Sequence, residues 1–152
     1  MKTQAFGTEI EVNRISRQAA ARAIAGVLST DGYTAEVRHE GGSYDAWVVI
    51  DREGRRWKCV SDGSIAGPRD QGTEFVTPVC RWEDIEMVQE VVRALRKAGA
   101  KVDSTCGIHI HVGLGEHTPR TLRNLVNIIN AKEPLRFSSS VYRGLTYVKE
   151  VA

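Results

Sequence analysis

The residues best suited to chemistry lie in the segment CGIHIHVG, in the last third of the chain. His109 and His111 stand two positions apart, so both side chains would point to one face of an extended strand. Ile108, Ile110 and Val112 would line the opposite face, the alternation expected of a strand with one side packed on a core. The segment therefore predicts a strand that buries its aliphatic residues and presents two imidazoles, which are common metal ligands.

The segment FGTEIEV near the N-terminus repeats this arrangement with carboxylates. Glu9 and Glu11 would share one face of a strand, while Phe6, Ile10 and Val12 would lie on the other. Either motif alone fits an ordinary solvated sheet, because charged residues commonly occupy the wet side of a half-buried strand. Together the motifs offer two carboxylates and two imidazoles on one surface, and these groups are metal ligands.

Two further acids, Asp62 and Glu74, lie between these motifs in short strand-like runs. Two carboxylates about 4 Å apart repel each other by about 4 kcal/mol at an effective dielectric constant of about 20. If three or four acids converge, protonation or a bound cation must relieve this repulsion. Near neutral pH we expect a divalent cation to do so.

The composition limits the classes of partner. The net charge of +2 is small and no lysine or arginine run tracks phosphates, so we expect no nucleic-acid partner. The three cysteines are an odd number without close pairing, which favours reduced thiols over a disulfide framework. The sequence has no signal peptide and no apolar run of about 20 residues, so we expect a cytoplasmic protein without a membrane span.

Hydrophobic periodicity and turn residues predict unequal strands and helices along one domain, residues 1–152. The predicted strands are 5–12, 34–38, 46–51, 56–61, 74–79 and 106–113, and the predicted helices are 15–28, 83–98 and 119–131. The natural assembly is an α+β fold, with one curved, mainly antiparallel sheet and helices on one face. Because the helices would cover the aliphatic side of the sheet, the glutamate and histidine side would be an open groove for ligands.

Several familiar motifs are missing from the sequence. It has no Walker loop, G-x-G-x-x-G fingerprint or Cys-x-x-Cys pair, which disfavours a P-loop NTPase, a Rossmann enzyme and a zinc ribbon. It also lacks a G-x-S-x-G nucleophile elbow. Ser61 and Ser64, which flank Asp62, are typical of residues that stabilise a turn.

Five motifs in order, GTEIEV, SDGSI, GTEFVTPV, CGIHIHVG and LVNIINAKEPL, resemble the amidoligase family over about residues 4–135. Amidoligases are carboxylate–amine ligases of the glutamine synthetase and glutamate–cysteine ligase superfamily. The resemblance implies a strongly bent antiparallel sheet whose concave face holds divalent cations and the phosphates of ATP. It also implies ATP-dependent joining of a small-molecule or peptide carboxylate to an amine through an acyl-phosphate, with Mg²⁺ or Mn²⁺ as the metal.

The resemblance assigns roles residue by residue. Glu9 and Glu11 match the Glu-x-Glu metal ligands of the family, and Glu74 matches the acid of the third motif. His109, the first histidine of its pair, matches the histidine beside the metal and phosphates. Asp62 falls where the family places an acid beside the substrate groove. The implied catalytic residues are therefore Glu11, Asp62, Glu74 and His109.

The remaining candidates have supporting roles. We expect His111 to support the metal ligands through hydrogen bonds. Lys58, Arg69 and Arg143 are the candidates for contact with nucleotide phosphates or a substrate carboxylate. Family members run on beyond the last helix, so this chain is expected to lack the C-terminal part of the fold that supplies basic residues. Its tail is expected to be loosely packed or to add an edge strand at 142–148, which could pair with a second copy of the chain in a homo-oligomer.

Two alternatives from other classes stay open. The chain could be a metal-dependent oxygenase or hydrolase with His109, His111 and Glu74 as a two-histidine, one-carboxylate site. It could also be a relative that binds nucleotide and metal without turnover. Preference for iron or zinc without nucleotide affinity would favour the first, and nucleotide binding without ADP production would favour the second.

Overall fold

The computed structural model describes residues 4–113, 115 and 117–132, and these contain six strands and three α-helices. The strands are β1 (Phe6–Asn13), β2 (Glu36–Gly41), β3 (Ala46–Ile50), β4 (Arg56–Val60), β5 (Gly72–Val76) and β6 (Ile108–Val112). The helices are α1 (Arg17–Leu28), α2 (Ile85–Lys97) and α3 (Pro119–Lys132), with a 3₁₀ turn, η1 (Trp82–Asp84), before α2. Each predicted element is present, with shifted ends. The edge strand predicted at 142–148 lies outside the described residues.

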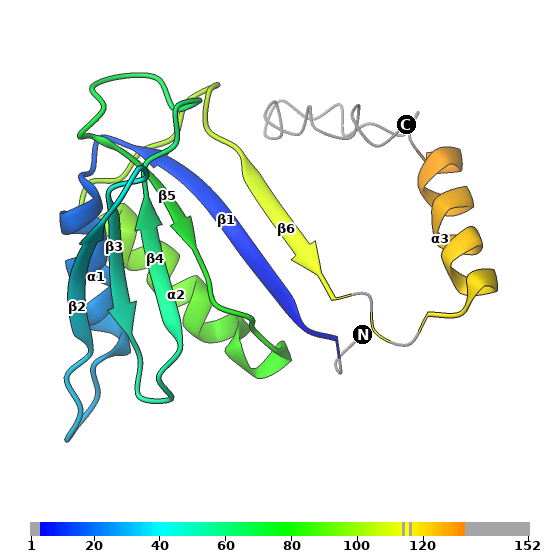
Figure 1. Cartoon of the computed structure of the whole chain (residues 1–152), viewed down its shortest axis with the longest axis horizontal. Helices are drawn as coiled ribbons and strands as arrows, with labels where there is room; N and C mark the ends of the chain where they lie inside the picture. Colours follow the sequence, from blue (N-terminus) through cyan, green and yellow to red (C-terminus); the bar gives the residue numbers. More distant parts are fainter. Residues whose placement is uncertain (1–3, 114, 116, 133–152) are drawn as a thin grey trace.

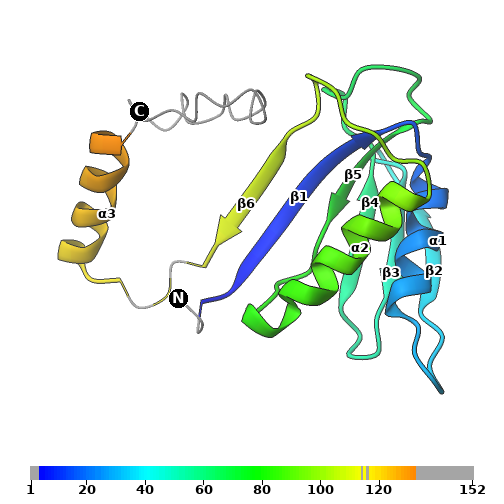
Figure 2. The same ribbon diagram turned by 180° about the vertical axis from the view of Figure 1, so that it is seen from behind.

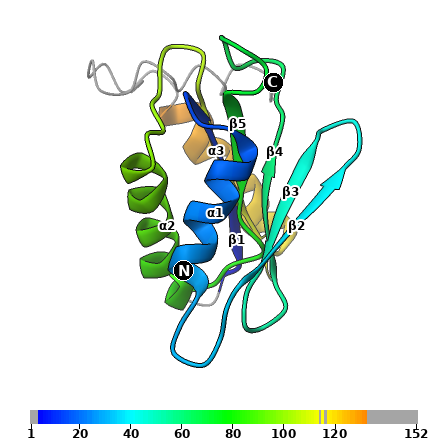
Figure 3. The ribbon, with the colours of Figure 1, turned by 90° about the vertical axis from the view of Figure 1, so that its left-hand side faces the viewer.

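The six strands form one open antiparallel sheet in the order β2-β3-β4-β5-β1-β6 (Figure 1). The N-terminal strand β1 thus lies between β5 and β6, which come much later in the chain. Helices α1 and α2 pack beside each other on one side of the sheet (Figure 3). The predicted α+β class, with an antiparallel sheet and helices on one face, is confirmed for this part of the chain.

The core lies between the sheet and these two helices. Ile24 of α1, Trp57 of β4, Phe75 of β5 and Leu95 of α2 are all completely or almost completely buried. The three cysteines are unpaired, and two of them, Cys59 and Cys80, belong to this core. No helix in the described part of the chain is long and apolar enough to cross a membrane.

Local signals fix where the helices begin. The Ser16 hydroxyl accepts a hydrogen bond from the Ala19 backbone N–H at 3.2 Å, so α1 begins at Arg17, two residues later than predicted. At the start of α3, the Thr118 hydroxyl accepts from the Thr121 backbone N–H at 3.2 Å, and Pro119 is the first helical residue, as predicted.

The expectation that β6 buries its aliphatic residues is wrong within the described structure. Ile108, Ile110 and Val112 are 53%, 67% and 62% exposed. The reason is the strand order, which puts β6 at the edge of the sheet, beyond the part that α1 and α2 cover. Helix α3, which follows β6 in sequence, stands apart from the sheet (Figures 1 and 2).

Buried Arg17 anchors the loop that joins β4 to β5 and carries Asp62. Its guanidinium donates to the carbonyl oxygens of Arg69 at 2.9 Å and Gly72 at 3.0 Å. It also donates to a carboxylate oxygen of Asp45 from Nε at 3.0 Å and from Nη2 at 2.5 Å. One cation at the start of α1 therefore holds the end of the 61–72 loop, because hydrogen bonds from a charged group are stronger than neutral ones.

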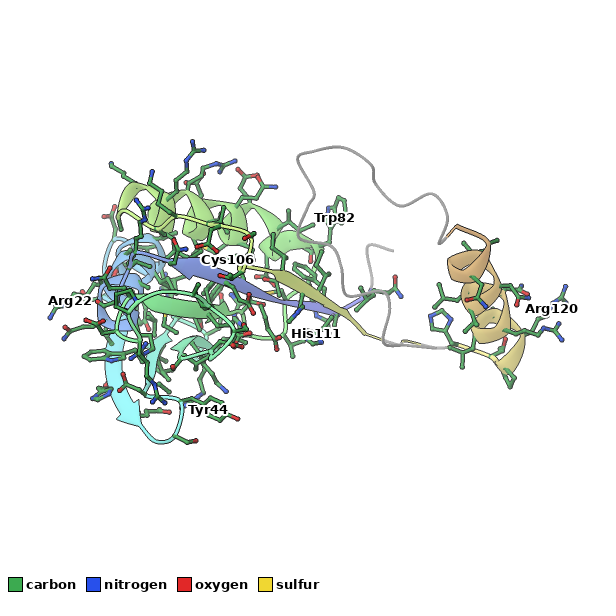
Figure 4. The ribbon with its side chains drawn as sticks, turned by 90° about the horizontal axis from the view of Figure 1, so that it is seen from above. Arg22, Tyr44, Trp82, Cys106, His111 and Arg120 are labelled. Atoms are coloured by element: carbon green, nitrogen blue, oxygen red, sulfur yellow. The ribbon has the colours of Figure 1, made fainter. Side chains whose placement is uncertain are left out.

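We predict that Arg17→Ala lowers the free energy of unfolding by about 2–4 kcal/mol, because it removes the guanidinium that donates to two carbonyls and to the Asp45 carboxylate. Urea unfolding measures this loss, and hydrogen exchange should show faster exchange of the 61–72 amides. Arg22→Ala is the matched control, since Arg22 is an exposed arginine of the same helix (labelled in Figure 4). Equal stability of the two variants would show that Arg17 does not anchor the loop.

Candidate metal-binding site

The registers of β1 with its two neighbours bring four predicted ligands to one face of the sheet. Glu11 pairs with Glu74 on β5, and Glu9 pairs with His109 on β6. Residues directly opposite each other in antiparallel strands point to the same face. The face is the one opposite α1 and α2, because the intervening residue Ile10 packs against the helix-side core. The spatial convergence follows the alternation seen in the sequence, while the role of these residues as ligands stays a prediction.

One group of potential ligands lies at the β6 side. A carboxylate oxygen of Glu9, one of Glu74 and a ring nitrogen of His109 lie within 4.8 Å of one another. Glu9 joins both histidines of the pair, with Oε2 3.1 Å from His109 Nδ1 and Oε1 3.2 Å from His111 Nε2. His111 therefore contacts a candidate ligand without belonging to the group, and its supporting role stays a prediction.

A second group lies on the other side of Glu74, towards the loop that joins β4 to β5. Carboxylate oxygens of Glu11, Asp62 and Glu74 also lie within 4.8 Å of one another. Glu11 is only 6% exposed, and its Oε2 accepts a hydrogen bond from the Gly107 backbone N–H at 2.6 Å. The carboxylate is thus fixed from β1 and from the segment that leads into β6.

Ser64 is a site residue whose role the sequence did not reveal. Its hydroxyl donates to Glu11 Oε1 at 3.2 Å, while its backbone N–H donates to Asp62 Oδ1 at 2.6 Å. The second bond is the turn interaction expected of a serine two residues after an aspartate. The first bond joins residues 53 positions apart, so no local pattern could have indicated it.

Glu74 belongs to both groups, and its pKa is raised by burial and by the convergence of these acids. Partial burial, followed by the negative charges of Glu9, Asp62 and Glu11, raises the pKa of Glu74 to about 7, against the lowering effect of His109. A divalent cation would offset the same repulsion that now favours the proton. Five oxygen-bearing or imidazole side chains suit Mg²⁺ or Mn²⁺, because hard cations prefer oxygen ligands.

The two basic candidates that the structure describes, Lys58 and Arg69, are not brought together. Lys58 lies on the same face as the acids, in a cross-strand row that runs through Val76 and Glu9 to His109. It is exposed and lines an open hollow of about 400 Å³ with Arg55 and Arg56. Arg69 lines a different hollow of about 410 Å³, which it shares with Asp62 and Tyr44. Arg143 lies outside the described residues.

The alternative set of two histidines and one carboxylate does not assemble. Within the described structure, the two groups of three potential ligands that lie within 4.8 Å both contain Glu74, and neither contains His111. The physical reason is the register, which sets His111 opposite Gly7, one row beyond Glu9 and His109. His111 points instead at Glu9.

Comparison with known proteins finds a match to one family model. A family model described as "putative amidoligase enzyme" matches residues 2–137, most of the chain. The chain belongs to the amidoligase family. No curated protein and no solved structure matches it significantly. The family gives amide-bond formation as the general activity of this amidoligase, and the family expected from the sequence is confirmed.

We predict that the metal-free amidoligase loses stability as the pH rises from about 4.5 to about 7. The folded state holds the Glu74 proton up to a pKa of about 7, whereas the unfolded chain releases it near 4.5, so folding binds a proton across this window. In the presence of a chelator, the melting temperature of the wild type should fall across this pH window by roughly 2–5 °C more than that of Glu74→Gln. The glutamine side chain of the variant cannot titrate.

Glu83→Gln, at an exposed acid of η1, is the control and should keep the wild-type slope. Differential scanning calorimetry at several pH values measures all three proteins. If Glu74→Gln and the wild type have parallel profiles, the Glu74 proton is not the source of the pH dependence.

Proposed function

We propose that this amidoligase is an ATP-dependent ligase that requires Mg²⁺ or Mn²⁺ and acts on the polar face of a glutamine synthetase-like sheet. It would join the carboxylate of a small molecule or peptide to an amine through an acyl-phosphate. The observation that carries this proposal is the pair of convergent ligand groups that share Glu74. Two adjacent sites rich in carboxylates suit phosphoryl transfer, in which charge on several phosphate oxygens must be offset.

The proposed reaction has two steps. The substrate carboxylate takes the γ-phosphoryl group of ATP and releases ADP, which turns a poor electrophile into an activated acyl group. The amine then attacks the acyl carbon, loses a proton and displaces inorganic phosphate. Divalent cations, when bound, would offset the negative charge of the phosphates during the first step.

The side chains divide this work by position. Glu9 and His109 would hold a cation at the β6 side, and Glu11 and Asp62 would hold one at the loop side, with Glu74 between them. His111 would keep Glu9 oriented through its 3.2 Å contact. These assignments rest on donor type and convergence.

The basic residues suit different anions. Exposed Lys58 makes no ion pair with another described residue and lies on the face of the acids, so a nucleotide phosphate is its natural partner. Arg69 lies in the hollow beside Asp62, where a substrate carboxylate would meet it. Arg143 remains a candidate for phosphate contact on the sequence alone.

We predict that Mg²⁺ stabilises the wild-type protein through Glu74. At a Mg²⁺ concentration of about 100 times the dissociation constant, binding should add about 2.7 kcal/mol to the free energy of unfolding. Glu74→Gln removes an oxygen ligand from both groups, so most of this gain should disappear, while Glu83→Gln should keep it. Thermal unfolding in Mg²⁺ and in chelator measures the gain. An equal gain in Glu74→Gln would place the cation elsewhere.

We predict that the wild-type protein releases ADP from Mg·ATP only when an acid and an amine are both present. A panel of amino acids and amines identifies the pair, and hydroxylamine in place of the amine should trap the acyl-phosphate as a hydroxamate. Glu74→Gln should lower the rate by about 10²-fold or more, as expected when an electrostatic stabiliser is lost. Glu83→Gln should be unchanged.

The other outcomes separate the alternatives. Nucleotide binding without ADP or hydroxamate would identify a non-catalytic relative. Binding of Fe²⁺ or Zn²⁺ without nucleotide affinity would favour a metal-dependent oxygenase or hydrolase instead.

A further inference from the structure

Two aliphatic surfaces have no partner within the described structure. The first is the side of β6 that carries Ile108, Ile110 and Val112, which are all more than half exposed. The second is on α3, where Leu125, Val126 and Ile128 are 43%, 56% and 59% exposed. Aliphatic side chains gathered on one surface are typical of an interaction site, whereas single exposed ones are ordinary.

The β6 surface continues into a hollow beside α2. Val112 and Phe6 line this hollow of about 170 Å³ together with Trp82 and Ile85, which lie at the start of the α2 region. Trp82 is 47% exposed (labelled in Figure 4). We call the apolar surface of Ile108, Ile110, Val112, Phe6 and Ile85 the β6 groove, with Trp82 at its edge.

The β6 groove is the open third position of the helix layer. α1 contacts strands β2 to β5, and α2 lies beside α1. Packed helices lie about 8–10 Å apart, whereas strands lie about 4.8 Å apart, so two helices cover roughly four strands. The sixth strand, at the edge, needs a third helix. A helix of 14 residues, the length of α3, spans about 21 Å, enough for the five residues of β6.

The chain directs its own α3 away from its own groove. The Gly113 N–H donates to the Ala5 carbonyl oxygen at 2.7 Å, and the Gln4 side chain donates to the Gly113 carbonyl at 3.4 Å. These bonds fix the point where the chain leaves the sheet. Beyond it, α3 shares no extended contact with any other described element (Figures 1 and 2). In the described part of the chain, the result is an arm with an aliphatic side and a body whose β6 groove is uncovered.

The charges beside the two surfaces are complementary. Residues 119–132 contain Arg120, Arg123 and Lys132 and no acid. The groove is bordered by the exposed acids Glu83 and Glu86 and by one exposed cation, Arg81, all next to Trp82 or Ile85 in the chain. A basic helix would therefore meet a rim with a net negative charge, an arrangement that guides association and sets orientation.

We propose that α3 of one copy packs in the β6 groove of a second copy, and reciprocally, so that the protein forms a symmetric dimer by helix exchange. The exchange buries both aliphatic surfaces at once, because each copy supplies one α3 and one β6 groove. It lies on the helix side of the sheet, so the acids and histidines of the opposite face stay open. The dimer is independent of the proposed ligase activity.

The first test is the mass of the purified chain by light scattering at micromolar concentrations. We expect twice 16.8 kDa for the wild type. The double variant Leu125→Asp, Val126→Asp should be monomeric, with dimer affinity reduced about 10²-fold or more, because two charges replace aliphatic groups at the contact. α3 makes no extended contact with its own body, so the monomeric variant should stay folded and unfold cooperatively, at a lower melting temperature than the dimer.

The matched control carries the same charges on the opposite side of α3. Asn124 and Asn127 are exposed, and neither lies on the aliphatic stripe. Asn124→Asp, Asn127→Asp should therefore remain dimeric. A monomeric wild type, or a dimer that survives Leu125→Asp, Val126→Asp, would overturn the proposal.

The second test shows which copy supplies the helix. In a Cys106→Ser background, one preparation carries Ile110→Cys and another carries Leu125→Cys. Mixed and oxidised, they should form a disulfide-linked dimer on a non-reducing gel. When both cysteines are placed in one chain, closure within that chain as a monomer would overturn the exchange and show that α3 folds back on its own groove.

Discussion

The polar face depends on the antiparallel register of β1 between β5 and β6. Because β1 pairs on both sides, the two glutamates of one strand each face a different partner: Glu11 faces Glu74, and Glu9 faces His109. Side chains alternate between the two faces of a strand, so a slip of one residue would turn both glutamates into the helix-side core. The aliphatic residues that alternate with them, Ile10 and Val12, oppose such a slip because they would lose their contacts with the helix-side core. Packing on one face of β1 thus fixes which side chains meet on the other face.

This constraint places like charges together, and the surrounding structure holds them there. Glu11 is held by Gly107 and Ser64, and the loop with Asp62 is tied down by buried Arg17. None of these bonds neutralises the carboxylates, so Glu74 keeps a raised pKa. Repulsion of this kind is kept in proteins where it serves binding.

The edge strand β6 has a separate role on each side. Its histidines face the acids of β1, while its isoleucines face outward on the helix side, where α1 and α2 do not reach. An edge strand with an uncovered aliphatic side is a liability for any protein. Helix exchange would remove it without touching the polar face, so association and catalysis can be altered independently.

The sequence by itself determined the elements and the faces of their side chains. Strict alternation in FGTEIEV and CGIHIHVG gave the side of Glu9, Glu11, His109 and His111, because the strand period is a local property. Cap residues such as Ser16 and Thr118 likewise act within one turn of their helices. The order of family motifs added the general chemistry.

Tertiary structure decided what depends on distant neighbours. The Ser64–Glu11 bond, the anchoring of the loop by Arg17 and the separation of Lys58 from Arg69 join residues with no shared local pattern. The exposure of Ile108, Ile110 and Val112 is of the same kind. Alternation shows which side of a strand is aliphatic, but burial also requires something to cover that side. Strand order, which only the assembled sheet reveals, leaves the aliphatic side of β6 uncovered in the part of the chain that the structure describes.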